Sequence, residues 1–399
     1  NSQEVYVSAY PDKGTETLYS LNLTNHKVEK IFQDPLADIS DSIQDFSERK
    51  IIGLSTALGK PEYFYLAPDD IKSQVHATLI HAFADQDVTI TSSTRNGESV
   101  VAFVKADDNA GDYYLFNKKT KSAEHLGSRR QWFTRDKLAN TESLTFKTRD
   151  GQVIYGYLTQ AKNSSKTNIP LVVLPHGGPH GVRDSWGFNA EVQLLASHGY
   201  AVLQVNFRGS DGFGLDFETA GHGQWGGLMQ DDITDGVNWL VERGVANKEK
   251  VAIYGGSYGG YATLAGITLT PDLYACAVDY VGVSNLFTFM ETIPPYWEQF
   301  REMLYQMVGD PKNAEDNARL RATSPVFLID NIKAPLLIVQ GANDPRVVQA
   351  ESDQMVAALQ KNDIDVEYIL KTDEGHGFRN EENRFEFYEA MEAFLGKYL

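Results

Sequence analysis

A serine in a glycine-rich turn is the strongest chemical signal in the sequence. The run GGSYG at residues 255–259 follows the apolar segment VAIY and leads into the helix-like segment YGGYATLAGI. This is a G-x-S-x-G pattern between a strand and a helix, where small flanking residues allow a tight turn. Such a turn would hold the Ser257 hydroxyl above the edge of a sheet, as the nucleophile of an acyl-transfer reaction.

A serine hydroxyl needs a base to accept its proton, and that base needs an acid to fix its tautomer. In hydrolases built from alternating strands and helices, the chain order is serine, acid, histidine. His376 is the only histidine after residue 222, and it lies in the glycine-flanked segment DEGHGF. His376 is therefore the predicted base.

The predicted acid is Asp344, in the segment GANDPR after the apolar run PLLIVQG. That position is the carboxyl end of a predicted strand, at the same sheet edge as Ser257. Asp279 on the preceding strand is the alternative acid. Asp373 and Glu374, which lie close to the histidine, are interpreted as solvated loop charges.

The oxyanion of the reaction needs two backbone N–H donors. One should come from Tyr258, the residue after the nucleophile, and another from the loop LPHGGPHG, where Gly177 or Gly178 can present an amide without a side chain in the way. His176 and His180 could instead bind a metal. No third ligand accompanies them at a sensible spacing, so we predict no metal and no other cofactor.

Two further patterns are interpreted as structural. The segment GHGQWG at residues 221–226 matches the dinucleotide pattern G-x-G-x-x-G, but no strand precedes it, so we predict a loop. Cys276 lies inside an apolar strand, where a cysteine is ordinarily a small buried hydrophobic residue.

Residues 136–399 carry the elements that must position these groups. Apolar strands alternate with amphipathic helices, which predicts an α/β unit whose sheet has eight mostly parallel strands and helices on both faces. The predicted strands are 144–148, 154–160, 169–174, 201–207, 251–254, 275–281, 335–340 and 366–371. The predicted helices are 189–197, 229–243, 258–269, 349–360 and 381–397.

Residues 1–135 have a different texture, with short strands of aromatic and β-branched residues separated by turns. We predict strands at 5–9, 17–21, 27–32, 51–54, 63–66, 88–91, 100–104 and 113–117. A loose repeat of about 45 residues is typical of propeller blades, and this length holds about three. Because three blades cannot close a ring, the segment is predicted to be part of a larger propeller. A small open β-sandwich is the alternative.

Composition excludes several classes of protein. The 36 Lys and Arg residues stand against 54 Asp and Glu, a net charge of −18 that would repel nucleic acid and anionic membrane surfaces. The single cysteine excludes an intramolecular disulfide, and no apolar run approaches the roughly 18 residues of a membrane helix. The compartment stays open. The first residue is Asn1 instead of Met, so we expect that something upstream was removed.

Five motifs occur in this order in residues 136–399: HGGPHG, GYAVLQVNFRGSDGFG, GGSYGGYATL, GANDPRV and DEGHGF. Through these motifs, residues 136–399 resemble the prolyl oligopeptidase family of serine peptidases. The resemblance is to its acylaminoacyl-peptidase and dipeptidyl-peptidase-like branch, and residues 1–135 resemble the closing blades of the family's propeller more weakly. It implies an α/β-hydrolase fold, a Ser257, Asp344 and His376 triad, and an oxyanion hole at Tyr258 and the loop at 176–179. It also implies that Arg346 holds a backbone carbonyl of a bound peptide, whereas a salt bridge is the alternative role for Arg346.

The expected function is hydrolysis of short peptides through an acyl-enzyme. A carboxylesterase on the same fold is the alternative, because the triad does not distinguish ester from amide. A catalytically silent scaffold that binds a partner is a third hypothesis. The earlier propeller blades are expected as a separate or removed segment that packs on residues 1–135. The oligomeric state, a homo-oligomer included, and the preferred side chain are left open by the sequence.

Overall fold

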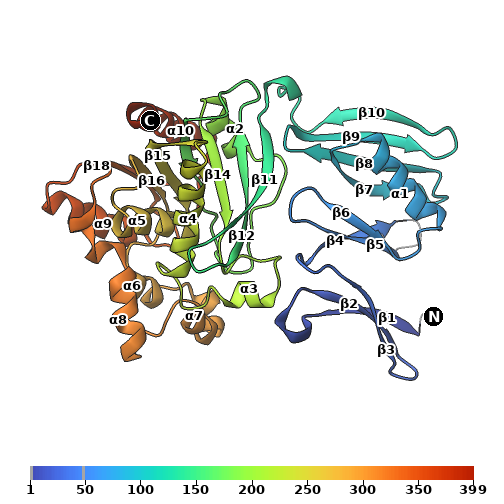
Figure 1. Ribbon diagram of the computed structural model, residues 1–399, viewed down its shortest axis with the longest axis horizontal. Helices are drawn as coiled ribbons and strands as arrows, with labels where there is room; N and C mark the ends of the chain where they lie inside the picture. Colours follow the sequence, from blue (N-terminus) through green and yellow to red (C-terminus); the bar gives the residue numbers. More distant parts are fainter. Residues whose placement is uncertain (1–2, 47–49) are drawn as a thin grey trace.

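An eight-stranded sheet and three smaller sheets make up the computed structural model of the protein, which describes residues 3–46 and 50–399. In Figure 1 the small sheets lie on the right and the large sheet, with its helices, on the left. Residues 129–139, which include a one-turn 3-10 helix at Arg135–Lys137, connect the two parts.

The three small sheets are antiparallel and follow one another along the chain. The first contains β1 (Glu4–Ala9), β2 (Thr17–Asn22) and β3 (Val28–Gln33), and the second contains β4 (Ile39–Asp45), β5 (Lys50–Thr56) and β6 (Glu62–Tyr65). The third contains β7 (Asp87–Ser93), β8 (Ser99–Ala106), β9 (Asn109–Asn117) and β10 (Ser122–Ser128). All eight strands predicted in this region are present, with small differences at their ends.

Two strands and one α-helix of this region were not predicted. β4 and β10 have few apolar residues, and the side chains of β10 are mostly exposed, so backbone pairing with a neighbouring strand determines both. The helix α1 (Ile71–Ala82) begins at Asp70, whose carboxylate accepts the Lys72 N–H. It buries Val75 and Leu79, four residues apart, against the third sheet. That cap and spacing could have been recognised in the sequence.

The large sheet has the strand order β11-β12-β14-β13-β15-β16-β17-β18. The first two pairings are antiparallel: they join β11 (Asn140–Lys147) to β12 (Val153–Gln160), and β12 to β14 (Ala201–Asn206). All later pairings are parallel, and they join β14 in turn to β13 (Ile169–Val173), β15 (Ala246–Gly256), β16 (Cys276–Tyr280), β17 (Leu336–Gly341) and β18 (Val366–Lys371). The prediction of eight mostly parallel strands is confirmed. The parallel strands end at one edge of the sheet, and that edge carries Ser257.

Helices cover both faces of this sheet. Apolar residues of α2 (Ala190–Ser197) and α10 (Glu381–Tyr398) pack on one face, and those of α4 (Leu228–Glu242), α5 (Tyr258–Leu269) and α9 (Gln349–Lys361) pack on the other. These five helices were predicted. The structure adds α3 (Leu215–Thr219), α6 (Leu286–Glu291), α7 (Arg301–Met307), α8 (Ala314–Thr323) and 3-10 helices at Pro11–Lys13, Pro295–Phe300, Pro325–Phe327 and Ile329–Asn331. The added helices are short, and α8 buries a single residue, Leu320, so no apolar period reveals it.

Hydrogen bonds join the small sheets to the loops at the carboxyl edge of the large sheet. The Asp38 carboxylate accepts the Glu16 N–H at 2.6 Å and the Gly214 N–H, in the loop after β14, at 3.0 Å. Arg183, in the loop after β13, donates to the Ala57 carbonyl at 2.7 Å. The small sheets are therefore fastened beside the edge at which Ser257 lies.

Within the described residues, no helix has the length and apolar character needed to cross a membrane.

Candidate active site

Ser257 occupies a strained turn between β15 and α5, with φ of 60° and ψ of −119°. The turn needs its glycines. A Cβ on Gly255 would lie 2.5 Å from the backbone of Gly259, and one on Gly259 would lie 2.2 Å from the Pro175 carbonyl oxygen. A non-glycine residue in such a conformation typically costs about 1–3 kcal/mol, which the surrounding packing must offset. The Ser257 N–H is held by the Tyr280 carbonyl at 2.9 Å.

His376 joins the serine to an aspartate. Its Nε2 lies 3.0 Å from Ser257 Oγ, and its Nδ1 lies 2.7 Å from Asp344 Oδ2. The other Asp344 oxygen accepts the N–H groups of Arg346 at 2.8 Å and Val347 at 3.0 Å, which orients the buried carboxylate. With its Nδ1 proton directed to Asp344, the imidazole presents the Nε2 lone pair to the serine hydroxyl. The arrangement can accept the serine proton.

The alternative acid lies elsewhere. The structure brings Asp344, and not Asp279, into contact with His376. Asp279 is 1% exposed, its Oδ1 has no hydrogen-bond partner among the described residues, and its burial raises the pKa to about 7. Oδ1 lies so close to Gly260 and Gly282 that a Cβ on either residue would be within 2.4 Å of it. Asp279 therefore packs against α5, the helix that follows Ser257.

The interpretation of Glu374 as a solvated loop charge is wrong. Its carboxylate is buried and accepts the N–H groups of Arg379 at 2.8 Å and Asn380 at 2.9 Å, together with the side-chain amide of Asn383. Burial raises the pKa of Glu374, but these hydrogen bonds outweigh burial and keep it below its usual value. Sequence alone could not reveal this, because the donors belong to the start of α10. Asp373 is exposed, as predicted.

The glycines predicted for the oxyanion hole lie beside the serine. A Cβ on Gly177 would come within 3.4 Å of Ser257 Cβ, and Gly178 has φ of +116°, a conformation that favours glycine. Tyr258, the other predicted donor, begins α5, so its N–H belongs to the first turn of a helix. Both segments therefore lie next to Ser257.

His176 holds this glycine loop. Burial lowers the pKa of its imidazole to about 4, so the ring is neutral near pH 7. Nδ1 lies 2.8 Å from the Gly177 carbonyl, Nε2 lies 2.8 Å from Ser210 Oγ, and the ring stacks on Phe207 at 4.4 Å. Because a carbonyl only accepts hydrogen bonds, Nδ1 carries the proton. The Gly178 N–H, on the far side of the same planar peptide, then points away from His176.

Arg346 lies two residues after Asp344 and is exposed. Its backbone N–H bonds to the acid. Among the ion pairs of residues 3–46 and 50–399, none includes Arg346, so its alternative role in a salt bridge finds no support in the structure. The exposed guanidinium thus has no ion-pair partner among the described residues.

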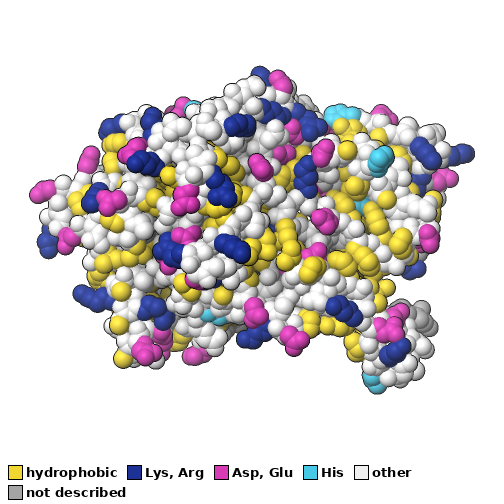
Figure 2. Space-filling model, viewed as in Figure 1, with side chains coloured by type: hydrophobic (Ala, Val, Ile, Leu, Met, Phe, Trp, Pro, Cys, Tyr) yellow, Lys and Arg dark blue, Asp and Glu magenta, His cyan; other side chains and the backbone are white. Residues whose placement is uncertain are grey.

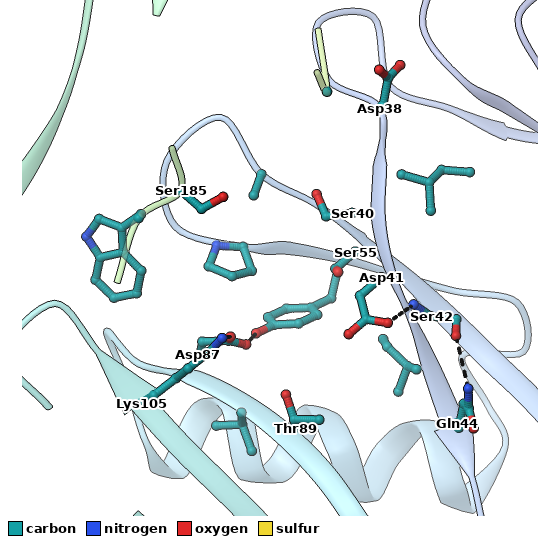
Figure 3. A pocket seen from close by; sticks show the side chains of 18 of the residues that line it. Asp38, Ser40, Asp41, Ser42, Gln44, Ser55, Asp87, Thr89, Lys105 and Ser185 are labelled. Carbon is teal, nitrogen blue, oxygen red and sulfur yellow. Dashed lines mark hydrogen bonds and ion pairs between the residues drawn. The ribbon is translucent and has the colours of Figure 1, made fainter. Parts of the chain in front are cut away.

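A cavity of about 630 Å³ lies at the junction between the small sheets and the loop after β13. Figure 3 shows Asp41 and Ser40 of β4, Asp87 of β7 and Ser185 around it. The Asp87 carboxylate accepts the Tyr63 hydroxyl at 2.8 Å and lies 3.3 Å from the Lys105 ammonium, so its charge is compensated. Ser257, Asp344 and His376 do not line the cavity, which therefore belongs to the junction.

Comparisons with known proteins bear on the family of the chain and on its fold. The family model described as the prolyl oligopeptidase family matches residues 186–399. Dipeptidyl aminopeptidase BIII of Pseudoxanthomonas mexicana is 39% identical over 408 residues, covering 100% of this chain and 58% of that protein. Dipeptidyl peptidase family member 6 of Caenorhabditis elegans is 38% identical over 389 residues, covering 92% of this chain and 52% of that protein. The chain thus spans about half the length of these relatives.

A solved structure of a puromycin-hydrolyzing peptidase of Mycobacterium tuberculosis matches with a TM-score of 0.79 and 23% identity, over 100% of this chain and 60% of the other. That likeness shows the fold. The expected architecture, an α/β-hydrolase preceded by part of a β-propeller, is confirmed. The family model matches more than half of the residues, and this match establishes that the chain belongs to the prolyl oligopeptidase family.

Proposed function

We propose that the protein is a serine peptidase that hydrolyses short peptides through an acyl-enzyme on Ser257. The observation that carries the proposal is the continuous set of contacts from Ser257 Oγ through His376 to Asp344, at 3.0 and 2.7 Å. Both distances are those of hydrogen bonds between a nucleophile, its base and an orienting acid.

The reaction begins when the scissile carbonyl carbon comes within reach of Ser257 Oγ. His376 Nε2 accepts the hydroxyl proton as Oγ attacks, and Asp344 stabilises the imidazolium that forms. The carbonyl oxygen becomes an oxyanion between the N–H of Tyr258 and that of Gly177 or Gly178. The orientation given by His176 favours Gly178 as the second donor. One such donor typically contributes about 10²–10³ in rate.

Collapse of the tetrahedral intermediate breaks the C–N bond. The His376 imidazolium gives its proton to the leaving amine, and the acyl group stays on Ser257 as an ester. A water molecule then loses a proton to His376 and attacks this ester, and the imidazolium returns the proton to Ser257. Atoms and charge balance without a cofactor.

The relatives' names bear on the substrate class. One relative is named a dipeptidyl aminopeptidase and another a dipeptidyl peptidase family member. An Arabidopsis thaliana relative, 28% identical over 254 residues, is named acylamino-acid-releasing enzyme. We propose that this protein removes a small group from the amino end of short peptides. The exposed guanidinium of Arg346 is proposed to hold a backbone carbonyl of the bound peptide, which requires an arginine without an internal ion pair.

The test compares kcat/KM on amides and esters that share one dipeptidyl group, with the wild type, Ser257→Ala and, as control, Ser197→Ala on the exposed end of α2. We expect amide hydrolysis by the wild type and the control, and a loss of about 10⁴-fold or more in Ser257→Ala. Turnover of the ester with no measurable amide hydrolysis would replace the proposal with the esterase alternative.

We further propose that residues 1–135 and 136–399 form two domains and that a further β segment packs on the first. β1 lies at the edge of its sheet, and its Val5, Tyr6 and Val7 are 37%, 45% and 39% exposed. Figure 2 shows hydrophobic side chains on the surface of the small sheets, on the right of the view. Exposed apolar edge strands are sites of pairing with other strands.

Intact-mass analysis and size-exclusion chromatography of the purified protein test this packing. A bound β-rich fragment that co-elutes with the chain supports it. A stable monomer of this chain alone argues against it, and a dimer would show that a second copy covers the edge instead.

A further inference from the structure

Tyr280 contacts the backbone of both the nucleophile turn and the base loop. It is the last residue of β16 and pairs with Gly256 of β15, and its carbonyl accepts the Ser257 N–H at 2.9 Å. Its hydroxyl accepts the N–H of Phe378, two residues after His376. We propose that Tyr280 is a positioning residue that sets the separation of Ser257 Oγ and His376 Nε2. The inference rests on the proposed hydrolase function.

The side chain of Tyr280 is itself held rigidly. Its ring packs edge to face on Phe378, with centroids 5.3 Å apart, and lies 4.7 Å from the ring of Phe387 in α10. The phenol therefore acts as a spacer of fixed length between the end of β16 and the base loop. A rigid aromatic spacer loses little conformational freedom when it makes this contact.

The base loop needs such a contact because its own backbone is permissive. Gly375 and Gly377 flank His376, and Gly377 has φ of +90°. On the acid side the loop is fixed, since the Asn343 N–H donates to the Glu374 carbonyl at 2.8 Å. On the serine side, the Phe378 N–H to Tyr280 contact supplies the matching restraint. Asn343 thus fixes the loop relative to Asp344, and Tyr280 fixes it relative to Ser257.

Removal of the hydroxyl leaves the Phe378 N–H without its acceptor and frees the loop on the serine side. Displacement of a catalytic group by about 1 Å can lower a rate about 100-fold. The loss falls on the chemical step, because neither Tyr280 nor Phe378 is required to touch the substrate. A fall in kcat with an unchanged KM is the signature of positioning.

The experiment compares Tyr280→Phe with Tyr388→Phe, a matched control that removes a tyrosine hydroxyl bonded to Glu191 at 2.8 Å and to none of the three triad residues. For Tyr280→Phe we expect kcat to fall about 10- to 100-fold with KM within about twofold of the wild type. Tyr388→Phe should keep the wild-type kcat. Thermal unfolding of both variants controls for a general loss of stability.

A crystal structure of Tyr280→Phe gives a readout independent of turnover. The inference predicts that the separation of Ser257 Oγ and His376 Nε2, 3.0 Å in the structure described above, is larger in the variant than in the wild type crystallised in parallel. An unchanged separation, or an active wild type with a Tyr280→Phe kcat within twofold of it, overturns the inference. A wild type that hydrolyses neither amide nor ester overturns the proposed function instead, and the measured separation still decides the positioning role.

Discussion

Ser257, His376 and Asp344 come from the ends of different strands and meet within hydrogen-bond distance. The sequence predicted Ser257 from the glycine turn and His376 from the chain order, whereas it favoured Asp344 as the acid and left Asp279 as an alternative. The residues that hold them could not be predicted. Tyr280 contacts Phe378, 98 residues away, and the Glu374 carboxylate contacts residues 5 to 9 positions further along the chain. Only the folded chain brings these partners together.

At the residue scale, His176→Ala tests the support of the oxyanion loop. The variant loses the hydrogen bond to the Gly177 carbonyl and the stacking on Phe207, so the Gly178 amide is no longer oriented. We expect kcat to fall about 10²–10³-fold, the effect of losing one oxyanion donor. His198→Ala, which removes an imidazole paired with Glu392, is the matched control. Equal kcat values for the two variants would refute the role of His176.

Asp279 gives a prediction on pH. Burial raises the pKa of Asp279 in the folded protein from 3.8 to about 7, so the folded state binds this proton more tightly than the unfolded chain. The stabilisation from this proton is full below pH 3.8 and is lost as pH rises to 7. Asp279→Asn has no such titration. The unfolding free energy of the variant, relative to the wild type, should therefore rise by about 1.4 kcal/mol per unit between pH 5 and 7 and level off above 7. Urea denaturation at pH 5, 6, 7 and 8 measures this, and a difference that does not vary with pH contradicts it.

At the element scale, the strands and helices with strong apolar periods were predictable, and the elements that depend on partners were not. β4 contains three polar or acidic residues in its first four positions, so its side chains give little apolar pattern. Backbone pairing with β5 makes this segment a strand. The helices α3 and α8 bury one residue each, α7 buries none, and α6 buries three in a helix of six residues. Their positions follow from the packing of loops around the large sheet, which a local pattern does not encode.

The close approach of α5 to the loop after β13 predicts that Gly259→Ala is strongly destabilising. Its Cβ would lie 2.2 Å from the Pro175 carbonyl oxygen, and backbone on both sides leaves no flexible side chain to move. We expect a loss of about 3 kcal/mol in the free energy of unfolding. Gly396→Ala in α10 is the control, because nothing lies within 4 Å of its Cβ, and it should be neutral or stabilising. Similar unfolding curves for the two variants would disprove this close contact.

At the scale of the whole molecule, the small sheets and the large sheet meet through polar contacts at the edge that carries Ser257. The sequence indicated both parts, because short strands separated by turns fill residues 1–135, whereas strands alternate with helices in residues 136–399. It gave no indication of the junction, because Asp38 bonds to Gly214 across 176 residues and Arg183 to Ala57 across 126. The net charge of −18 likewise describes solubility and partners, and it does not determine how the parts join.

Arg183→Met should loosen this junction. The guanidinium donates to the Ala57 carbonyl and lies 4.4 Å from the Phe213 ring, and methionine keeps the apolar stem while losing both contacts. We expect faster proteolytic cleavage in the connection at residues 129–139, measured by time-resolved limited proteolysis. Arg243→Met, which removes a guanidinium lying 4.0 Å from the Trp239 ring, is the control and should be cleaved at the wild-type rate. Equal rates for both variants would count against a role of Arg183 in the junction.

The central claim is that His376 activates Ser257 for acyl transfer, and a serine-directed phosphonate tests it most directly. After reaction with the reagent, peptide mass spectrometry should locate a single adduct on Ser257 in the wild type, and His376→Ala should remain unlabelled under the same conditions. An unlabelled wild type, or labelling of Ser257 that proceeds equally well without the imidazole, would contradict the account.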